Sequence, residues 1–311
     1  MTTYEKIYLL LQENGDFMSG EAIAKRLEIS RTAVWKGIKT LESKGLTIQS
    51  VKTRGYKLLK GDLLLPEFLS QELGIAVTFN PDSQSTQTDA KNGMEKGLES
   101  PHLYLANQQT AAKGRFNRNF FTSPQGGIYM SLHFKPQVTV TELPPYTVMV
   151  ASSIVKAISR LMGIETEIKW VNDIYLDNRK VAGILTEAIA SVESGLVTDV
   201  IIGVGINFQI EQFPEALQSK ATSLFSEKAS ITRNQLIAEI WKLFLTIPEK
   251  DLVKVYKEKS LVLDKQVTFV ENGIEMTGTA TNITDQGHLI VRLENGQEKI
   301  LRSGEVSLSS W

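Results

Sequence analysis

The segment A-N-Q-Q-T-A-A-K-G-R-F-N-R, residues 106–118, places three cationic side chains around one glycine. Lys113, Arg115 and Arg118 surround Gly114, and the segment contains no acidic residue. Ammonium and guanidinium groups form charge-assisted hydrogen bonds with phosphate or carboxylate. Glycine lets the backbone approach a ligand closely. The segment therefore predicts a loop that wraps an anionic ligand, and the alternative is an ordinary solvated basic loop.

Two further segments lie where predicted strands begin or end. They read K-W-V-N-D at residues 169–173 and N-R-K-V-A-G-I-L at residues 178–185. Taken alone, the first is also consistent with a strand end followed by an Asx turn. Lys180 in the second is equally consistent with an exposed charge at a strand edge. Each segment alone leaves these alternatives open.

Two other short motifs follow apolar strands. S-T-Q at residues 85–87 is typical of a helix cap. G-V-G-I-N at residues 203–207 resembles part of a dinucleotide-binding fingerprint, but Phe208 follows it and no phosphate-binding helix is evident. We therefore reject a Rossmann fold.

Composition bounds the class of protein. The chain has 311 residues, 42% hydrophobic and 22% charged, which indicates a globular protein with one large domain and one or two small ones. The absence of cysteine excludes disulfides, thiolate metal sites and thiol catalysis, and three separated histidines argue against a histidine-built metal site. Neither a signal peptide nor a membrane-spanning run is evident, so we expect a cytoplasmic protein without membrane partners.

Charge is unevenly distributed along the chain. Residues 1–60 contain 11 Lys and Arg against 6 Asp and Glu, a net charge of +5. The remaining residues contain 23 against 29, a net charge of −6. A basic N-terminal fifth on an acidic remainder indicates a small module that binds nucleic acid.

Apolar spacing in this module predicts two short helices and a third from Arg31 to about Ser43. Alternation from Leu46 to Leu58 predicts a two-stranded wing. The pattern resembles the winged helix domains of bacterial transcription regulators. A domain that binds protein, or that has lost its DNA, remains the alternative. The expected DNA-binding residues are Ser30, Arg31, Thr32, Lys36, Lys39 and Arg54.

Residues from about 75 to 260 alternate apolar strands with helical stretches, which indicates a sheet with helices packed on it. Helices are expected at 63–73, 146–162 and 233–245, and the order of strands in the sheet is left open. Strands are expected at 75–80, 102–108, 127–134, 165–171, 174–176, 180–188 and 198–207. From Lys265 a short β-rich region contains turns at Asn272-Gly273 and Asn295-Gly296.

Together these motifs resemble the biotin–protein ligases, and in particular the bifunctional biotin ligases that are also biotin operon repressors. S-T-Q, Q-Q-T, K-G-R-F-N-R, S-P-Q-G-G, K-W-V-N-D-I-Y, R-K-V-A-G-I-L and G-V-G-I-N follow in the family's order. The resemblance implies an α+β protein of three domains. These are a winged helix-turn-helix (1–62), a mixed-sheet catalytic domain of the biotin/lipoate ligase, class II synthetase-like type (63–262), and a small SH3-like barrel (263–311).

The resemblance also implies a two-step reaction. The biotin carboxylate attacks the α-phosphate of ATP with Mg²⁺, and a lysine of a carrier domain then takes biotin from biotinyl-5′-AMP. The implied catalytic residues are Lys180, Arg115 and Arg118. The implied biotin-binding residues are Ser85, Thr86, Gln87, Gln109, Lys113, Gly114, Arg115, Lys180, Gly183, Leu185, Gly203 and Gly205. The implied ATP-binding residues are Arg118, Phe120, Lys169, Asn172, Asp173 and Asn207, with Asp173 also the candidate ligand of Mg²⁺.

The cationic loop departs from the family's usual G-R-G-R pattern. Ala112 and Lys113 replace the first glycine and arginine, and Phe120 stands where tryptophan is common. Lysine cannot make arginine's planar two-pronged contact, so we expect altered retention of the adenylate. The implied partners are a biotin carboxyl carrier domain, operator DNA and a second copy of the chain on adenylate binding. Alternatives are a ligase without DNA regulation, a non-catalytic biotin-sensing repressor and a lipoate ligase.

Overall fold

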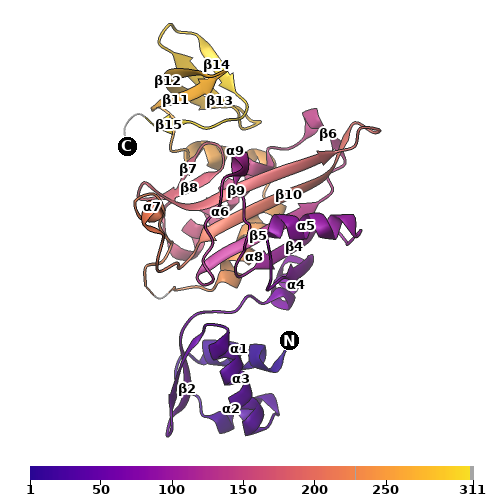
Figure 1. Ribbon diagram of the computed structural model, residues 1–311, viewed down its shortest axis with the longest axis vertical. Helices are drawn as coiled ribbons and strands as arrows, with labels where there is room; N and C mark the ends of the chain where they lie inside the picture. Colours follow the sequence, from indigo (N-terminus) through magenta and orange to yellow (C-terminus); the bar gives the residue numbers. More distant parts are fainter. Residues whose placement is uncertain (228, 309–311) are drawn as a thin grey trace.

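The computed structural model describes residues 1–227 and 229–308. Figure 1 shows three regions in chain order: a helical N-terminal region, a central sheet with helices, and a small β region. The predicted end of the third domain, residue 311, lies outside the described residues. Within the described residues, no helix has both the length and the apolar character needed to cross a lipid bilayer.

The N-terminal region is a winged helix, as predicted. Its elements are α1 (Thr3–Asn14), α2 (Gly20–Leu27), α3 (Arg31–Ser43), β1 (Thr47–Val51) and β2 (Gly55–Lys60). The Ser30 hydroxyl caps α3 by accepting from the Ala33 amide at 3.1 Å. Val34, Ile38 and Leu41 bury the inner face of α3. The opposite face of α3 is therefore free to meet a partner.

The central sheet of the described residues has eight strands in the order β3-β4-β5-β10-β9-β8-β7, with β6 paired to β10. Only β3 and β4 run parallel; the other pairs are antiparallel. The mixed sheet confirms the expected fold class. The strands are β3 (Ala76–Phe79), β4 (His102–Ala106), β5 (Gly127–Phe134), β6 (Val138–Thr139), β7 (Glu167–Lys169), β8 (Asp173–Leu176), β9 (Arg179–Ala190) and β10 (Leu196–Asn207).

The two faces of this sheet have different roles. Along β10, Ile202 and Ile206 join the main hydrophobic core with α6 and α8, whereas Ile201 packs with Ala90 of α5. Successive side chains of a strand point to opposite faces, so Gly203 and Gly205 lie on the α5 face.

The helices are α4 (Pro66–Leu73), α5 (Thr86–Glu95), α6 (Tyr146–Met162), α7 (Glu215–Gln218), α8 (Arg233–Thr246) and α9 (Glu249–Glu258), with short 3₁₀ turns η1 (Arg115–Asn117) and η2 (Val140–Glu142).

The sequence prediction was wrong or incomplete at four helices. It did not predict α5, α7 or α9, and it began the connector helix at residue 63 instead of Pro66. Proline favours the first helical position, and the residue before it is pushed to extended backbone. Residues 63–65 are accordingly not helical.

The C-terminal region forms a five-stranded sheet in the order β14-β13-β12-β11-β15. Asn272 and Gly273 both have positive φ, as a tight hairpin turn between β11 and β12 requires. The Trp170 indole nitrogen donates to the Gly287 carbonyl at 2.9 Å and connects this region to the central domain. The strands are β11 (Gln266–Glu271), β12 (Ile274–Ile283), β13 (Leu289–Leu293), β14 (Glu298–Leu301) and β15 (Ser307–Leu308).

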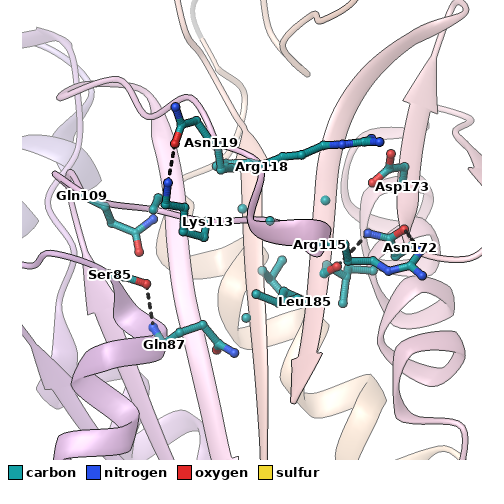
Figure 2. Close-up of a pocket in the computed structure, with 18 of the residues that line it drawn as sticks. Ser85, Gln87, Gln109, Lys113, Arg115, Arg118, Asn119, Asn172, Asp173 and Leu185 are labelled. Atoms are coloured by element: carbon teal, nitrogen blue, oxygen red, sulfur yellow. Dashed lines mark hydrogen bonds between the residues drawn. The ribbon is translucent and has the colours of Figure 1, made fainter. Parts of the chain in front are cut away.

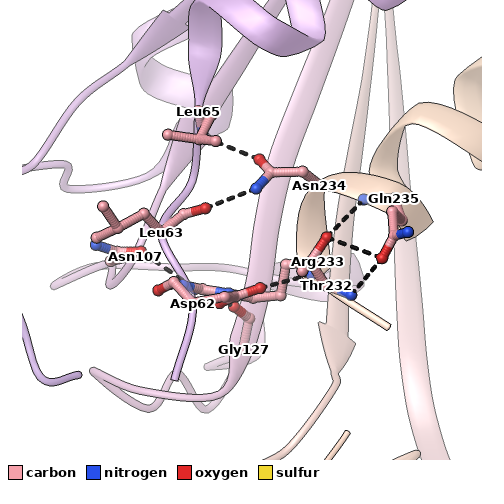
Figure 3. A network of polar contacts seen from close by, with 9 residues as sticks. All are labelled: Asp62, Leu63, Leu65, Asn107, Gly127, Thr232, Arg233, Asn234 and Gln235. Atoms are coloured by element: carbon pink, nitrogen blue, oxygen red, sulfur yellow. Dashed lines mark hydrogen bonds and ion pairs between the residues drawn. The ribbon is translucent and has the colours of Figure 1, made fainter. Parts of the chain in front are cut away.

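A buried polar network joins the winged helix to the central domain (Figure 3). Arg233, at the start of α8, donates from Nε to the Asp62 carboxylate at 2.6 Å. The same guanidinium donates to the Asn107 side chain and to the Gly127 carbonyl, both at 3.1 Å. Asn107 and Gly127 bracket the segment that carries the cationic loop. One buried arginine thus holds both the linker and the two ends of that segment.

The linker also alternates between two hydrophobic cores. Leu63 and Leu65 are buried in the winged-helix core, whereas Leu64 is buried in the main hydrophobic core of the central domain. The Asn234 side chain donates to the Leu63 carbonyl and accepts from the Leu65 amide. The connection between the domains is therefore a packed and hydrogen-bonded element, not a flexible tether.

Candidate active site

A pocket of about 190 Å³ lies on the α5 face of the sheet, beneath the cationic loop (Figure 2). It gathers the ends of several elements that are far apart in the sequence. Its lining comprises Ser85, Thr86, Gln87, Gln109, Ala112, Lys113, Gly114, Arg115, Arg118, Asn119, Phe120, Asn172, Asp173, Lys180, Gly183, Ile184, Leu185, Gly203, Val204, Gly205 and Glu305.

Glycines form the floor of the pocket. Gly183 pairs with Gly205 across β9 and β10, and Leu185 pairs with Gly203. A Cβ at Gly205 would lie 2.5 Å from the Phe120 ring, far inside van der Waals contact. The absence of side chains lets the Phe120 ring lie directly against the strands. The same property leaves room for a flat ligand.

One end of the pocket is polar but uncharged. Gln109 accepts from the Thr86 amide at 2.7 Å, and the Thr86 hydroxyl lies 2.8 Å from that of Ser131. The Ser85 hydroxyl caps α5 by accepting from the Gln87 amide, as its S-T-Q motif predicted. Hydroxyls and amides can both donate and accept, so this end suits a neutral polar ring.

The cationic loop folds as a hairpin. The Gly114 amide donates to the Arg118 carbonyl at 2.8 Å, and the Phe120 amide donates to the Ala112 carbonyl at 3.1 Å. The Lys113 ammonium donates to the Asn119 side chain at 2.6 Å. Hydrogen bonds within the loop thus hold the segment that departs from the family pattern.

Both arginines of the loop contact the C-terminal region. Arg118 donates with both terminal nitrogens to the Glu305 carboxylate, at 2.6 and 2.8 Å. Arg115 donates to the Asn172 side chain at 3.2 Å and to the Gly304 carbonyl at 3.0 Å. The segment before β15 thus forms one wall of the pocket.

Lys180 lies at the charged end of the pocket, where its ammonium pairs with Asp173 at 2.7 Å. Its direction follows from an irregularity in β9. Ile174 pairs with Ala182 but Tyr175 pairs with Lys180, so Val181 is an extra residue in the ladder. Val181 and Ala182 both bury in the main core. The bulge therefore returns Lys180 to the pocket face.

Two of the predicted ATP-binding residues do not line the pocket. Asn207 is buried, and its amide donates to the Lys180 and Thr222 carbonyls. Asn207 therefore positions the backbone at Lys180 and does not face the ligand space. The ammonium of Lys169 lies 5.7 Å from the centre of the Tyr175 ring. Both residues are the last of their strands, Lys169 in β7 and Asn207 in β10.

The charged end contains one carboxylate besides Glu305. No cluster of three or more acidic, histidine or cysteine side chains that could hold a metal ion occurs among the described residues. Asp173 and Asn172 alone fit a metal that arrives with a phosphate ligand, because Mg²⁺ is usually held by one or two carboxylates and substrate phosphates. Burial, with the carboxylates of Asp173 and Glu305, raises the pKa of Tyr175 to about 12, so this phenol stays protonated at neutral pH.

Comparison with known proteins places this geometry in a family. The model of the biotin/lipoate A/B protein ligase family matches residues 80–207, a helix-turn-helix domain model matches residues 3–57, and the biotin protein ligase C-terminal domain model matches residues 262–309. The bifunctional ligase/repressor BirA of Bacillus spizizenii is 31% identical, and the alignment covers 94% of this chain and 95% of that protein. The chain belongs to the bifunctional ligase/repressor family.

Other relatives agree with this assignment. The bifunctional ligase/repressor BirA of Escherichia coli is 27% identical, with 97% of this chain and 96% of that protein covered. Among solved structures, the biotin protein ligase of Aquifex aeolicus in complex with biotin and ATP has a TM-score of 0.63 at 24% identity, covering 75% of this chain and 97% of that one. This structural likeness supports the ligase fold of the catalytic and C-terminal regions.

The structure brings together every residue predicted from the ligase/repressor resemblance to bind biotin, together with four of the six predicted to bind ATP. It adds Ala112, Asn119, Ile184, Val204 and Glu305, which sequence reasoning did not include in the site. Ile184 and Val204 adjoin predicted residues along their strands, and Asn119 adjoins Arg118. Glu305 comes from another domain, and no local pattern marks it. The roles of the gathered residues stay predictions.

Proposed function

We propose that the chain is an ATP-dependent biotin–protein ligase that forms biotinyl-5′-AMP and transfers biotin to a lysine of a biotin carboxyl carrier domain. One observation carries this proposal: a single pocket has an uncharged hydrogen-bonding end and a cationic end, connected by a glycine floor. A neutral ureido ring fits the first end, and reacting carboxylate and phosphate oxygens fit the second. Biotin alone carries one carboxylate, whereas four cationic side chains, Lys113, Arg115, Arg118 and Lys180, line this pocket.

Lys180 acts where negative charge develops. Its ammonium leaves Asp173 and donates to the oxygens of the reacting carboxylate and α-phosphate. A fixed donor in a site shielded from water is worth about 3–4 kcal/mol to such a transition state. Asn207 supports this role by holding the Lys180 carbonyl. Arg115 and Arg118 close over the adenylate and keep water from the mixed anhydride.

Mg²⁺ bound to ATP would neutralise phosphate charge at this end of the pocket. Asp173 and Asn172 are the side chains in position to hold it or its water ligands. The experiment that tests the function is incubation of the purified chain with biotin, MgATP and a carrier domain. The expected product is a carrier that has gained one biotinyl group, with AMP and pyrophosphate released.

Glu305 should assist ATP binding by fixing Arg118. We expect Glu305→Gln to keep the fold but to raise KM for ATP about two- to fivefold, because an exposed ion pair contributes roughly 0.2–1 kcal/mol. Initial rates of carrier biotinylation at varied ATP measure this. Glu298→Gln, which removes an exposed charge elsewhere in the same small domain, is the control. An unchanged KM for ATP in the Glu305 variant would refute the positioning role.

We propose further that the winged helix represses transcription when biotin is abundant. The outer face of α3 exposes Arg31, Lys36 and Lys39. At the wing, the Arg54 guanidinium lies 4.1 Å from the centre of the Phe17 ring, which holds this cation in a defined place. Adenylate binding then favours a homodimer that presents two such surfaces to a two-fold operator.

Removal of one phosphate-contacting cation should weaken DNA binding uniformly. For Lys36→Gln we expect a weaker affinity for duplex DNA and a salt dependence whose log–log slope falls by about 1. Fluorescence anisotropy with labelled duplex at several salt concentrations measures the slope. Lys6→Gln removes the same charge from α1 and should leave the slope unchanged. Equal slopes for the wild type and both variants would favour a ligase without DNA regulation.

A further inference from the structure

A chain of three side chains closes the uncharged end of the pocket. Gln87, from the first turn of α5, donates from Nε2 to a Glu187 carboxylate oxygen at 2.8 Å. Lys91, one turn further along α5, donates to the other oxygen at 2.9 Å. Glu187 lies on β9 two residues beyond Leu185, so it shares the pocket face of that strand. Figure 2 shows Gln87 reaching from α5 into the pocket.

The chemistry of these groups fixes which way the Gln87 amide points. A carboxylate can only accept hydrogen bonds, so the NH₂ group of Gln87 must face Glu187. Lys91 can only donate, and it donates to the other carboxylate oxygen of Glu187. The carbonyl oxygen of Gln87 must then point the other way. The pocket is therefore given an acceptor at this place and not a donor.

This acceptor has no partner in the described part of the chain. The Oε1 atom of Gln87 is buried and makes no hydrogen bond there, and the residue as a whole is only 8% exposed. The oxygen lies over the glycine floor, since a Cβ at Gly203 would come within 2.8 Å of it. A buried acceptor without a donor is unfavourable, and a ligand N–H brought to it over Gly203 relieves that cost.

We propose that Glu187, held by Lys91, is a positioning and specificity residue that locks Gln87 as an acceptor for an N–H group of a cyclic urea. This inference rests on the proposed biotin-ligase function and deepens it. A ureido ring supplies such an N–H, whereas the dithiolane ring of lipoate supplies none. From Gly183, beside Lys180, to Glu187 the strand rises about 13 Å. The end of the pocket for the ureido ring and the end for the reacting groups therefore lie apart along β9.

Steady-state kinetics of carrier biotinylation separate positioning from a structural role. For Glu187→Leu we expect KM for biotin to rise about tenfold, while kcat at saturating biotin stays within twofold. Glu187→Gln should bring KM for biotin most of the way back to the wild-type value, because its side-chain oxygen can still accept from Gln87. Lys91→Met, which leaves the bond between Gln87 and Glu187, should change KM less than threefold. An unchanged KM in Glu187→Leu would overturn the inference.

Binding of biotin without ATP, measured by calorimetry, gives the second readout. Biotin methylated on its ureido nitrogens lacks the N–H groups, so the wild type should prefer biotin strongly. In Glu187→Leu this preference should fall at least fivefold, and in Glu187→Gln it should persist. If Glu187→Leu weakened the binding of biotin and of methylated biotin equally, this inference would be overturned, while the ligase activity of the wild type would still stand. A wild type that neither binds nor transfers biotin would overturn the proposed function together with this inference.

Discussion

Lys180→Ala should lower kcat/KM for carrier biotinylation by a factor of about 10² to 10³, the usual cost of removing one fixed donor from a developing anion. Its ammonium is the cation that the β9 bulge directs onto the pocket face, beside Asp173. Because the uncharged end of the pocket lies apart from Lys180, binding of biotin without ATP should persist. Single-turnover formation of biotinyl-5′-AMP measures the loss at the first step.

The matched control for this variant is Lys220→Ala. The Lys220 carbonyl accepts from the Lys180 amide, but its own side chain is exposed to solvent. We expect that variant to retain full activity. Activity of Lys180→Ala within threefold of wild type would remove Lys180 from the proposed chemistry, whatever the control does.

Arg233→Met should destabilise the protein by about 3–5 kcal/mol, because it leaves the largely buried Asp62 carboxylate without its cationic partner. The change also removes the donors to Asn107 and Gly127, so both ends of the loop segment lose a support. Urea unfolding, monitored with two independent probes, measures the decrease in the free energy of unfolding. Two probes are needed because a chain with several domains need not unfold in one step.

A double variant separates the charge effect from lost packing. Asp62→Asn removes the carboxylate charge but keeps an acceptor for the α8 amide of Arg233. Arg233→Met with Asp62→Asn should therefore be less destabilised than the sum of the two single changes. A loss below 1 kcal/mol in Arg233→Met alone would show that the network does not stabilise the connection between the domains.

Most of the pocket was predicted from several motifs that together resemble the ligase/repressor family, since each motif alone left other interpretations open. Gly183, Gly203 and Gly205 fall on β9 and β10, and the order of the motifs matched a family. Their contact follows from local strand geometry once the sheet is formed. In contrast, the bulge that directs Lys180 depends on the pairing of β8 with β9, which no single strand reveals.

The helix α5 and the pocket residue Glu305 were not predicted from the sequence, for other physical reasons. The buried face of α5 consists of Thr86, Gln87, Ala90 and Gly93, small or polar residues that give no amphipathic signal. Gly93 is needed there because a Cβ would collide with the Tyr104 hydroxyl. Glu305 reaches Arg118 from 187 positions away in the chain. Such contacts arise from the packing of domains and leave no spacing in the sequence.

The most direct test of the central proposal is intact-mass measurement of a biotin carboxyl carrier domain incubated with the purified chain, biotin and MgATP. The expected result is a carrier heavier by one biotinyl group on a single lysine, with one AMP released per transfer and none when biotin or ATP is omitted. A carrier whose mass stays unchanged, while the chain still binds biotin, would contradict the proposed ligase and favour a biotin-sensing repressor without transferase activity.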